Sequence, residues 1–320
     1  MKVLFWGTPD FALPTLRALW EEGHEIVGVV TQPDKPAGRG RSLRASPVKR
    51  EAQSIGARVL QPERPRGEDF LAAIGSLEPD ISVVAAYGHI LVEEVLNLPP
   101  HGSVNVHASL LPELRGAAPV NWAIIGGHPK SGVTVMRMVR ELDAGPVLYQ
   151  IPIDILPGMS AGDLFSITAE LGAEALIEAL ALLEAGALES HEQDDSLATY
   201  APKLGREDAR LDWSFPAIEL DAWVRGCDPW PAAWSELDGT AVQMFEPTLE
   251  ESDGGGDAET PGSARATPGE IVEADPRSGL LVATGHGALR LGVVKPAGRA
   301  RMSAAAWVRG RGVVVGQHLV

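Results

Sequence analysis

The chain has 320 residues, of which 45% are hydrophobic, and a formal net charge of −16 with a pI near 4.9. This length exceeds that of a usual single domain, so we expect two domains. The acidity disfavours general affinity for nucleic acid, the single Cys227 excludes an internal disulfide framework, and no apolar run approaches the roughly 18 residues of a membrane span. These features predict a cytoplasmic protein with no membrane partner.

The chain opens with a βαβ pattern. Val3–Trp6 predicts a first strand and Ile26–Val30 a second. Between them, Thr8 is expected to cap a helix that has Pro9 at its first position. The fingerprint Gly-x-Gly-x-x-Gly is missing, so the opening has the architecture of a dinucleotide-binding fold without its phosphate-binding turn.

A basic stretch follows the second strand, from Gln32 to Arg50. Within it, Gln32–Arg41 contains Pro and Gly and no apolar anchor, so we predict an exposed, mobile loop there, and Ser46-Pro47 is expected to start another helix. Two interpretations stay open: a solvated loop whose charges serve solubility, or an arm whose arginine forks grip phosphate groups. The candidate phosphate-contacting residues are Lys35, Arg39, Arg41 and Arg44.

Two later stretches predict neighbouring strands with different patterns. Ile81–Ala86 is an apolar, β-branched run typical of a buried parallel strand. Val104–His107 alternates, so Asn105 and His107 face the same side. Such side chains are either satisfied by neighbours or line a cavity, because burying them unpaired is costly. Cavities in open α/β sheets lie beyond the carboxyl ends of the strands, and this strand ends at His107, so the pair is a candidate site.

The pattern changes in the second half of the chain. Gly132–Met138 and Val147–Ile153 predict two more strands, and a long helix is expected from Ser160 to Leu183. Ser190–Arg210 is polar without a clear period and is interpreted as a linker. Leu211–Phe215 is expected to form a strand.

Beyond this point, short strands recur at the spacing of hairpins and predict a small β-barrel. They are Ala232–Leu237, Ala241–Phe245, Glu270–Glu273, Leu280–Ala283 and Ala288–Val294. The predicted fold class is α/β, with an N-terminal Rossmann-like, mostly parallel sheet covered by helices on both faces and a C-terminal small, OB-like β-barrel. The expected division is residues 1–189, a linker of residues 190–208, and residues 209–320. Glu250–Thr267, rich in Gly, Ser, Ala and acidic residues, is expected to be a disordered loop within the barrel.

Asp143 is a second candidate for chemistry. By itself it has the character of a turn residue, because Asp-x-Gly-Pro is good turn chemistry. If it meets His107, a carboxylate would hold the imidazole in one orientation, and Asn105 would offer an amide N–H to a developing oxyanion. This constellation suits an acyl-type transfer without a Ser or Cys nucleophile, since no Gly-x-Ser-x-Gly elbow is present. The scattered histidines show no metal-ligand spacing, so no metal is expected.

These residues carry a resemblance to a known family. Asn105-Val106-His107, the loop Ser109–Pro112 and the downstream Leu142–Gly145 are similar to the active-site signature of the 10-formyltetrahydrofolate-dependent formyltransferases. Further segments resemble the members of that family that act on methionyl-tRNA. These segments are Gly7–Phe11, the basic stretch, Ala201–Leu204, Ala209–Trp213, Pro229–Pro231 and Lys295–Gly298. The chain departs from the family pattern at Glu113-Leu114, at His89 and in the length of Glu250–Thr267.

The resemblance implies a formyl transfer from 10-formyltetrahydrofolate to the α-amino group of methionine on initiator methionyl-tRNA, for translation initiation. Asn105, His107 and Asp143 would be catalytic. The folate co-substrate would bind residues of two loops, namely Tyr87, Gly88, Ile90, Ser109, Leu110, Leu111 and Pro112. The tRNA would contact Lys35, Arg39, Arg41 and Arg44, and the barrel would hold its stem. The protein is expected to be a monomer.

Three other interpretations remain. The same triad could act on a small amine or on water, although a small substrate would need neither the basic arm nor the barrel. A nicotinamide oxidoreductase would fit the βαβ opening but lacks the glycine fingerprint. A non-catalytic RNA-binding module would leave the Asn105–His107 pair unexplained.

Overall fold

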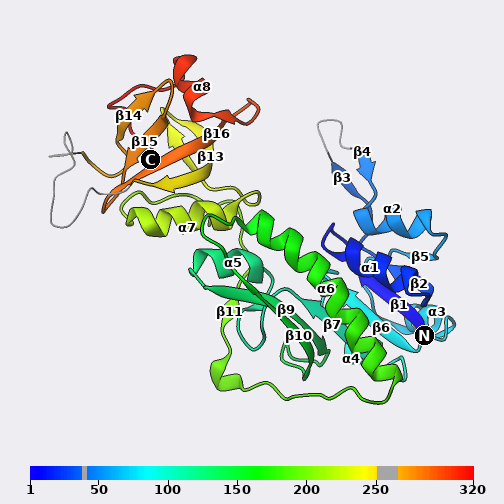
Figure 1. The fold of residues 1–320 in the computed structure, drawn as a ribbon. Coiled ribbons are helices and arrows are strands. Elements are labelled where there is room, and N and C mark those ends of the chain that lie inside the picture. The colour runs from blue at the N-terminus through cyan, green and yellow to red at the C-terminus, as the bar shows by residue number, and fades with distance from the viewer. Residues whose placement is uncertain (38–41, 251–265) are drawn as a thin grey trace. The chain divides into compact units, whose positions relative to one another are not determined.

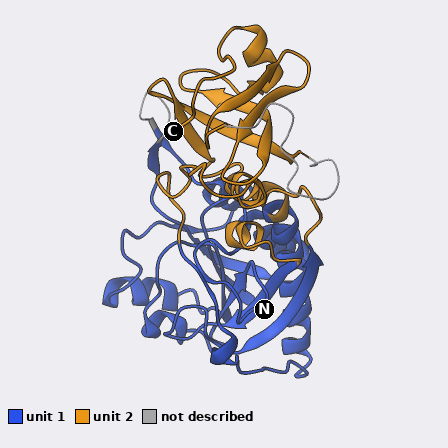
Figure 2. Cartoon of the chain, turned by 90° about the vertical axis from the view of Figure 1, so that its left-hand side faces the viewer, with its two compact units in different colours: residues 1–119, 130–154, 165–202 blue, residues 120–129, 155–164, 203–320 orange. Residues whose placement is uncertain are grey.

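The computed structural model describes residues 1–37, 42–250 and 266–320. Arg39, Arg41 and residues 251–265 of the predicted disordered loop therefore lie outside the described residues. The chain forms two compact units, shown in different colours in Figure 2. The first comprises residues 1–119, 130–154 and 165–202, and the second comprises residues 120–129, 155–164 and 203–320.

The first unit is built on a seven-stranded sheet with the order β10-β9-β7-β6-β1-β2-β5. The strands from β7 to β5 are parallel, β9 is antiparallel to β7, and β10 is antiparallel to β9. This arrangement confirms the predicted Rossmann-like, mostly parallel sheet (Figure 1). The strands are β1 (Lys2–Gly7), β2 (Glu25–Val30), β5 (Val59–Leu60), β6 (Ile81–Ala85), β7 (Ser103–His107), β9 (Lys130–Arg137) and β10 (Val147–Asp154).

Helices cover both faces of this sheet. Trp6 of β1 packs edge-on against Phe70 of α3, with ring centroids 6.0 Å apart, which places α3 on one face. On the other face Gly172 of α6 lies so close to Val106 of β7 that a Cβ at this glycine would stand 2.7 Å from the valine side chain. The helices of this unit are α1 (Ala12–Glu21), α2 (Pro47–Ser54), α3 (Glu68–Gly75), α4 (Glu93–Leu96) and most of α6 (Ala161–Glu184). The helix α5 (Pro119–Ile125) belongs, except for its first residue, to the second unit.

The predicted start of the first helix is wrong. Thr8 and Pro9 precede the helix, which begins at Ala12, because the Pro9 carbonyl accepts the Ala12 N–H at 3.1 Å in a turn of its own. The Thr8 hydroxyl donates instead to the carbonyl of Tyr87 at 2.9 Å. A side chain that fits the capping pattern is thus used to join two loops at the carboxyl edge of the sheet.

The basic stretch is exposed at Lys35 and Arg44, as predicted, but it is not a plain loop. Its described part forms an antiparallel hairpin of β3 (Lys35–Ala37) and β4 (Ser42–Arg44), in which Lys35 pairs with Arg44. Each strand has three residues, and Leu43 is 71% exposed. Because the hairpin buries so little apolar surface, hydrophobic alternation could not reveal it.

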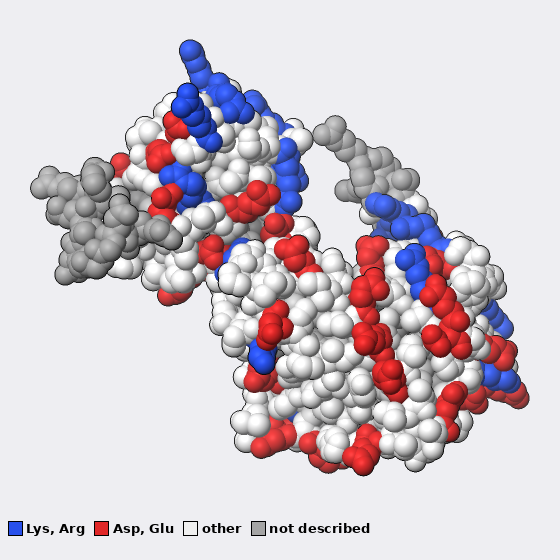
Figure 3. All heavy atoms as spheres, in the orientation of Figure 1, with Lys and Arg blue, Asp and Glu red and all other residues white. Residues whose placement is uncertain are grey.

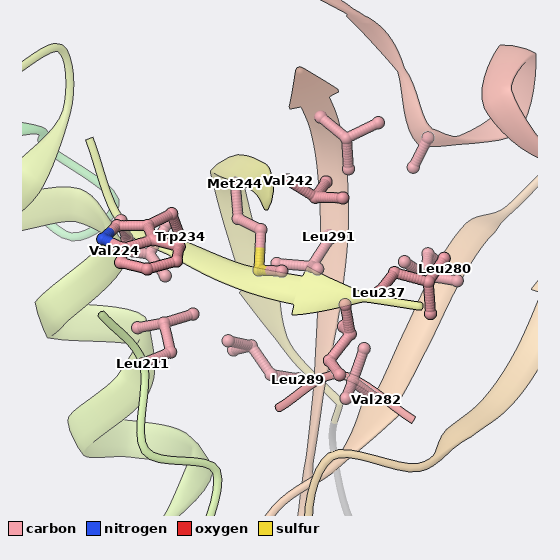
Figure 4. Close-up of a cluster of buried hydrophobic side chains, with 14 of the residues drawn as sticks. Leu211, Val224, Trp234, Leu237, Val242, Met244, Leu280, Val282, Leu289 and Leu291 are labelled. Atoms are coloured by element: carbon pink, nitrogen blue, oxygen red, sulfur yellow. The ribbon is translucent and has the colours of Figure 1, made fainter. Parts of the chain in front are cut away.

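The second unit is built on an antiparallel sheet with the order β12-β13-β16-β15-β14, and β17 pairs with β16. Its core is drawn in Figure 4, where strand side chains such as Met244, Leu289 and Leu291 meet Val224 of α7. The elements are α7 (Ala217–Cys227), β12 (Trp234–Leu237), β13 (Thr240–Leu249), β14 (Ile271–Asp275), β15 (Gly279–Ala283), β16 (Ala288–Pro296), β17 (Met302–Ser303) and α8 (Ala304–Arg309).

The chain's last residues bridge the two edges of this sheet. Val320 exchanges two backbone hydrogen bonds with Glu236 of β12, both 2.9 Å long. The Leu319 N–H donates to the Gly269 carbonyl, just before β14, at 2.9 Å. The sheet is therefore a curled half-barrel, and the predicted fold class is confirmed for both parts of the chain.

The expected strand Leu211–Phe215 is absent from the second unit. The Asp212 carboxylate accepts hydrogen bonds from the N–H and hydroxyl of Ser214, at 3.0 and 2.6 Å, and so fixes a turn. Leu211 and Trp213 are nevertheless buried, which accounts for their strand-like spacing. Among the described residues, no helix is long and apolar enough to cross a membrane.

We expect the Cys227 thiol to be inert in the folded protein. Its side chain is fully buried, and burial raises its pKa to about 12, with a smaller contribution from Asp208. Because the thiolate is the reactive form, an aromatic disulfide reagent at pH 8 should modify the native chain at least about 10²-fold more slowly than the chain unfolded in guanidinium. Equal rates before and after unfolding would contradict this burial.

Candidate active site

The strand β7 carries Asn105 and His107 on one face of the sheet. Asn105 lies opposite Val84 of β6 and Met136 of β9, and His107 lies opposite Thr134 of β9. Val106 points to the other face, toward α6. The alternation thus leaves the two polar side chains on one face, at the carboxyl end of β7. This strand lies inside the sheet, between β6 and β9 (Figure 1).

The two side chains differ in their hydrogen bonding. The His107 ring is 6% exposed, and its Nε2 lies 3.0 Å from the carbonyl oxygen of Leu114. Since a carbonyl can only accept, Nε2 carries a proton and donates it. The carboxamide of Asn105 is half-buried and has no hydrogen-bond partner within the described part of the chain. It remains free to bind another group.

Asp143 lies beside the other ring nitrogen. Its Oδ2 is 3.7 Å from His107 Nδ1 and accepts the backbone N–H of Gly116 at 2.9 Å. Asp143 has a positive φ of 51°, so its turn adopts the left-handed backbone that Asp tolerates better than most residues. Because its oxygen lies this close to Nδ1, the Asp143 carboxylate can compensate the positive charge that the ring acquires during proton transfer.

The loop between β7 and Gly116 is held by side chains of the two antiparallel strands. Thr134 Oγ1 donates to the Ser109 carbonyl at 2.6 Å and accepts the Leu111 N–H at 3.1 Å. Gln150 Nε2 donates to the Leu111 carbonyl at 3.0 Å. Ser109 and Leu111 are consequently buried, while Leu110 and Pro112 are half-buried.

A segment that follows α6 holds the same loop from its other end. Thr199 Oγ1 accepts the Leu114 N–H at 2.8 Å, and β8 (Arg115–Gly116) pairs in parallel with β11 (Tyr200–Ala201). Gly116 has a φ of +121°, and a Cβ there would stand 2.6 Å from the Ala201 carbonyl oxygen. Only glycine allows this close approach.

The loop after β6 carries the remaining predicted folate-binding residues. Tyr87 is 2% exposed, its ring packs edge-on against Trp6, and burial raises its pKa to about 12. Gly88 is exposed and Ile90 is 82% exposed. Because β6 and β7 are parallel neighbours, this loop and the Ser109–Pro112 loop leave the sheet at the same edge.

The predicted tRNA-contacting residues are separate from the triad. Lys35 and Arg44 are exposed on the β3–β4 hairpin, and Arg39 and Arg41 lie in the part of the arm that is not described. Lys35 Nζ donates to Gln32 Oε1 at 2.5 Å, and Gln32 Nε2 donates to the Tyr87 carbonyl at 3.0 Å. The base of the hairpin is thereby joined to the predicted folate-binding loop.

Sequence reasoning missed three residues that support this site, namely Arg115, Gln193 and Thr199. Thr199 and Gln193 lie in the polar stretch interpreted as a linker, where no apolar period indicates packing. Arg115 follows the Ser109–Pro112 signature by three residues. A cationic side chain this close to the predicted site could have been singled out as one that needs a buried partner. Within the described ranges, no cluster of three or more His, Cys, Asp or Glu side chains could hold a metal ion.

Comparison with solved structures shows the same fold at low sequence identity. A methionyl-tRNA formyltransferase from Clostridium thermocellum matches with a TM-score of 0.57 and 12% identity, covering 79% of this chain and 95% of that one. HypX from Aquifex aeolicus, solved in complex with tetrahydrofolic acid, matches with a TM-score of 0.65 and 20% identity, covering 96% of this chain and 46% of that one.

Comparison of sequences is more specific. Residues 1–180 match the family model described as formyl transferase, and residues 203–312 match the model of the formyl transferase C-terminal domain. A methionyl-tRNA formyltransferase of Bacillus licheniformis is 43% identical over 99% of this chain and 98% of its own length. One from Pseudomonas paraeruginosa is 47% identical over 91% of this chain and 90% of its own length. These matches confirm the family resemblance of the sequence, and the chain belongs to the methionyl-tRNA formyltransferase family.

Proposed function

We propose that this protein transfers the formyl group of 10-formyltetrahydrofolate to the α-amino group of methionine on initiator methionyl-tRNA, for translation initiation. The observation that carries the proposal is the unpaired carboxamide of Asn105 beside the His107–Asp143 pair, at the edge of the sheet where ligands bind in this fold class. Family membership over nearly the whole chain supports the same reaction.

The reaction needs one bond made, one bond broken and one proton moved. A free α-amino group titrates near 7.7–8.0 and an ester lowers this value, so a useful fraction of the aminoacyl-tRNA is already the neutral nucleophile. Its nitrogen bonds to the formyl carbon, and the carbonyl oxygen becomes an oxyanion. Collapse of this intermediate breaks the bond to folate N10, which takes up the proton that the amine loses.

The geometry suggests a role for each residue. The Asn105 amide can donate to the oxyanion, because nothing among the described residues competes for its N–H groups. In the neutral ring His107 Nδ1 bears the lone pair and makes no hydrogen bond, so it can take the proton that the amine loses. The N–H formed in this way can then donate to the oxyanion. Asp143, with Oδ2 3.7 Å away, orients the ring and helps pass the proton toward N10.

We further propose where the two substrates bind. The folate would lie between the loops Tyr87–Ile90 and Ser109–Pro112, which leave the sheet at the same edge. The tRNA would contact the hairpin and the second unit, with residues 1–189 carrying the chemistry and residues 209–320 holding the stem. Lys and Arg side chains gather around β3 and β4 and over part of the second unit in Figure 3, whereas the charged side chains on the rest of the first unit's visible face are mostly carboxylates.

The second unit also offers a surface suited to RNA. A cavity of about 400 Å³ is lined by Trp230, Lys295 and Arg301, and Trp230 is 69% exposed. The exposed indole can stack on a base, and the cationic groups beside it can contact a phosphate.

We propose that the protein acts as a cytoplasmic monomer.

A direct assay tests the proposed reaction. The protein is incubated with 10-formyltetrahydrofolate and initiator tRNA charged with methionine. The amino acid is then released by hydrolysis of its ester bond, and its mass is measured by mass spectrometry. Formyl transfer adds about 28 Da to methionine, with free methionine and methionine methyl ester as controls for a small-amine substrate. No mass gain on the tRNA-bound amino acid, or an equal gain on the free ester, would refute the proposal.

The Asn105→Asp variant should test the oxyanion donor. It keeps the shape of the side chain but replaces the amide N–H groups by a negative charge, so kcat should fall by about 10²–10³-fold or more. Asn97→Asp, at an exposed position on the same unit, is the matched control and should retain wild-type turnover. Near-normal turnover of the Asn105 variant would remove this residue from the mechanism.

The Arg44→Ala variant should test the hairpin. Loss of one phosphate contact should weaken tRNA binding. The negative slope of the logarithm of the tRNA binding constant against log salt should become shallower by about 0.7–0.9, while folate affinity stays unchanged. Arg58→Ala is the matched control. This exposed arginine lies at the amino end of the parallel strand β5, whereas the hairpin follows the carboxyl end of the neighbouring strand β2. A fall in folate affinity equal to the fall in tRNA affinity would contradict the assignment.

A further inference from the structure

One side chain outside the proposed catalytic triad holds the turn that carries Asp143. Gln193 Nε2 donates to two backbone carbonyls of this turn, that of Asp143 at 2.9 Å and that of Gly145 at 2.7 Å. Gln193 comes from the segment after α6, fifty residues away from Asp143 in sequence. The turn packs closely against β9 at Gly145, where a Cβ would stand 1.9 Å from the Arg137 carbonyl oxygen, so only glycine fits.

The other end of the same amide binds a buried cation. Gln193 Oε1 accepts from Arg115 Nε at 3.0 Å and from Arg115 Nη2 at 2.8 Å. Arg115 is 4% exposed, and its Nη2 also donates to Asp195 at 2.8 Å. A guanidinium buried to this degree is tolerated only when it is well paired, so Gln193 and Arg115 depend on each other.

Arg115 lies between the two backbone groups that define the site. The residue before it, Leu114, supplies the carbonyl that accepts His107 Nε2, and the residue after it, Gly116, supplies the N–H that binds Asp143 Oδ2. The Gln193–Arg115 pair therefore joins the segment that orients the imidazole to the turn that presents the carboxylate.

We propose that Gln193, acting with Arg115, is a positioning residue that sets the distance between the Asp143 carboxylate and His107 Nδ1. This proposal rests on the proposed function, because the distance matters for formyl transfer. Without the Gln193 amide, the Asp143 and Gly145 carbonyls lose their side-chain donor, so the left-handed turn relaxes and the carboxylate moves away from the ring. Gln193 does not touch the reacting atoms and would not contribute to substrate binding.

Two variants test the proposal. Gln193→Leu removes the whole amide, and Gln193→Glu keeps an acceptor for Arg115 but loses the donors to Asp143 and Gly145. Both should lower kcat by about 10²-fold while the KM values for folate and tRNA stay within about threefold of wild type. Glu192→Gln, at the exposed neighbouring position, is the matched control and should behave as wild type. Changes in KM alone would overturn the proposal.

A double-mutant cycle separates positioning from a general structural role. In an Asp143→Asn background, the carboxylate is already absent, so Gln193→Glu should lower kcat by less than about twofold further. A purely structural role predicts that the second substitution costs the same factor in both backgrounds. That result would overturn the proposal.

A measurement that does not depend on activity completes the test. The Gly116 amide donates to Asp143 Oδ2, so hydrogen exchange of this amide, followed by NMR, should be at least about tenfold faster in Gln193→Glu than in wild type and unchanged in Glu192→Gln. Unchanged exchange in Gln193→Glu would overturn the proposal. If the wild-type protein transferred no formyl group, the proposed function would fail, while faster exchange would still support the positioning of Asp143 by Gln193.

Discussion

The hydrogen bond from His107 Nε2 to the carbonyl of Leu114 is the constraint on which the site depends. A carbonyl oxygen cannot donate, so this 3.0 Å contact settles which nitrogen carries the proton in the neutral ring. Nδ1 is then left with its lone pair toward Asp143, 3.7 Å away. Because the contact is made through the backbone of Leu114, the departure from the family pattern at Glu113-Leu114 leaves it intact.

Side chains from other parts of the first unit hold the loop that carries the Leu114 carbonyl. Thr134, in the sheet, fixes the loop at Ser109 and Leu111, and Thr199 fixes it at Leu114. A polar network in which each buried group has its partner makes a segment rigid, whereas an unpaired buried group is costly. Asn105 differs from these side chains, since its carboxamide is half-buried and has no hydrogen-bond partner in the described residues. Such an unsatisfied group beside a rigid frame is what a preorganised oxyanion donor requires.

Much of the fold and part of the site could be predicted from the sequence. The strand periods gave the two-part architecture, and the alternation in Val104–His107 placed Asn105 and His107 on one face. The side chains that support the site could not be predicted. Gln193 and Thr199 lie in a polar stretch, and their role comes from hydrogen bonds to residues 48 to 85 positions away in the sequence. Local patterns fail for the same reason at Thr8, whose hydroxyl binds a distant carbonyl instead of capping a helix.

The state of the His107 ring tests this account most directly. In protein labelled with ¹⁵N-histidine, long-range correlation spectra distinguish a protonated ring nitrogen from one that bears a lone pair, at a pH where the ring is neutral. The structure predicts a proton on Nε2 and a lone pair on Nδ1. A neutral ring with its proton on Nδ1 would mean that the bond to Leu114 is not made in solution, and the proposed arrangement of Asn105, His107 and Asp143 would be contradicted.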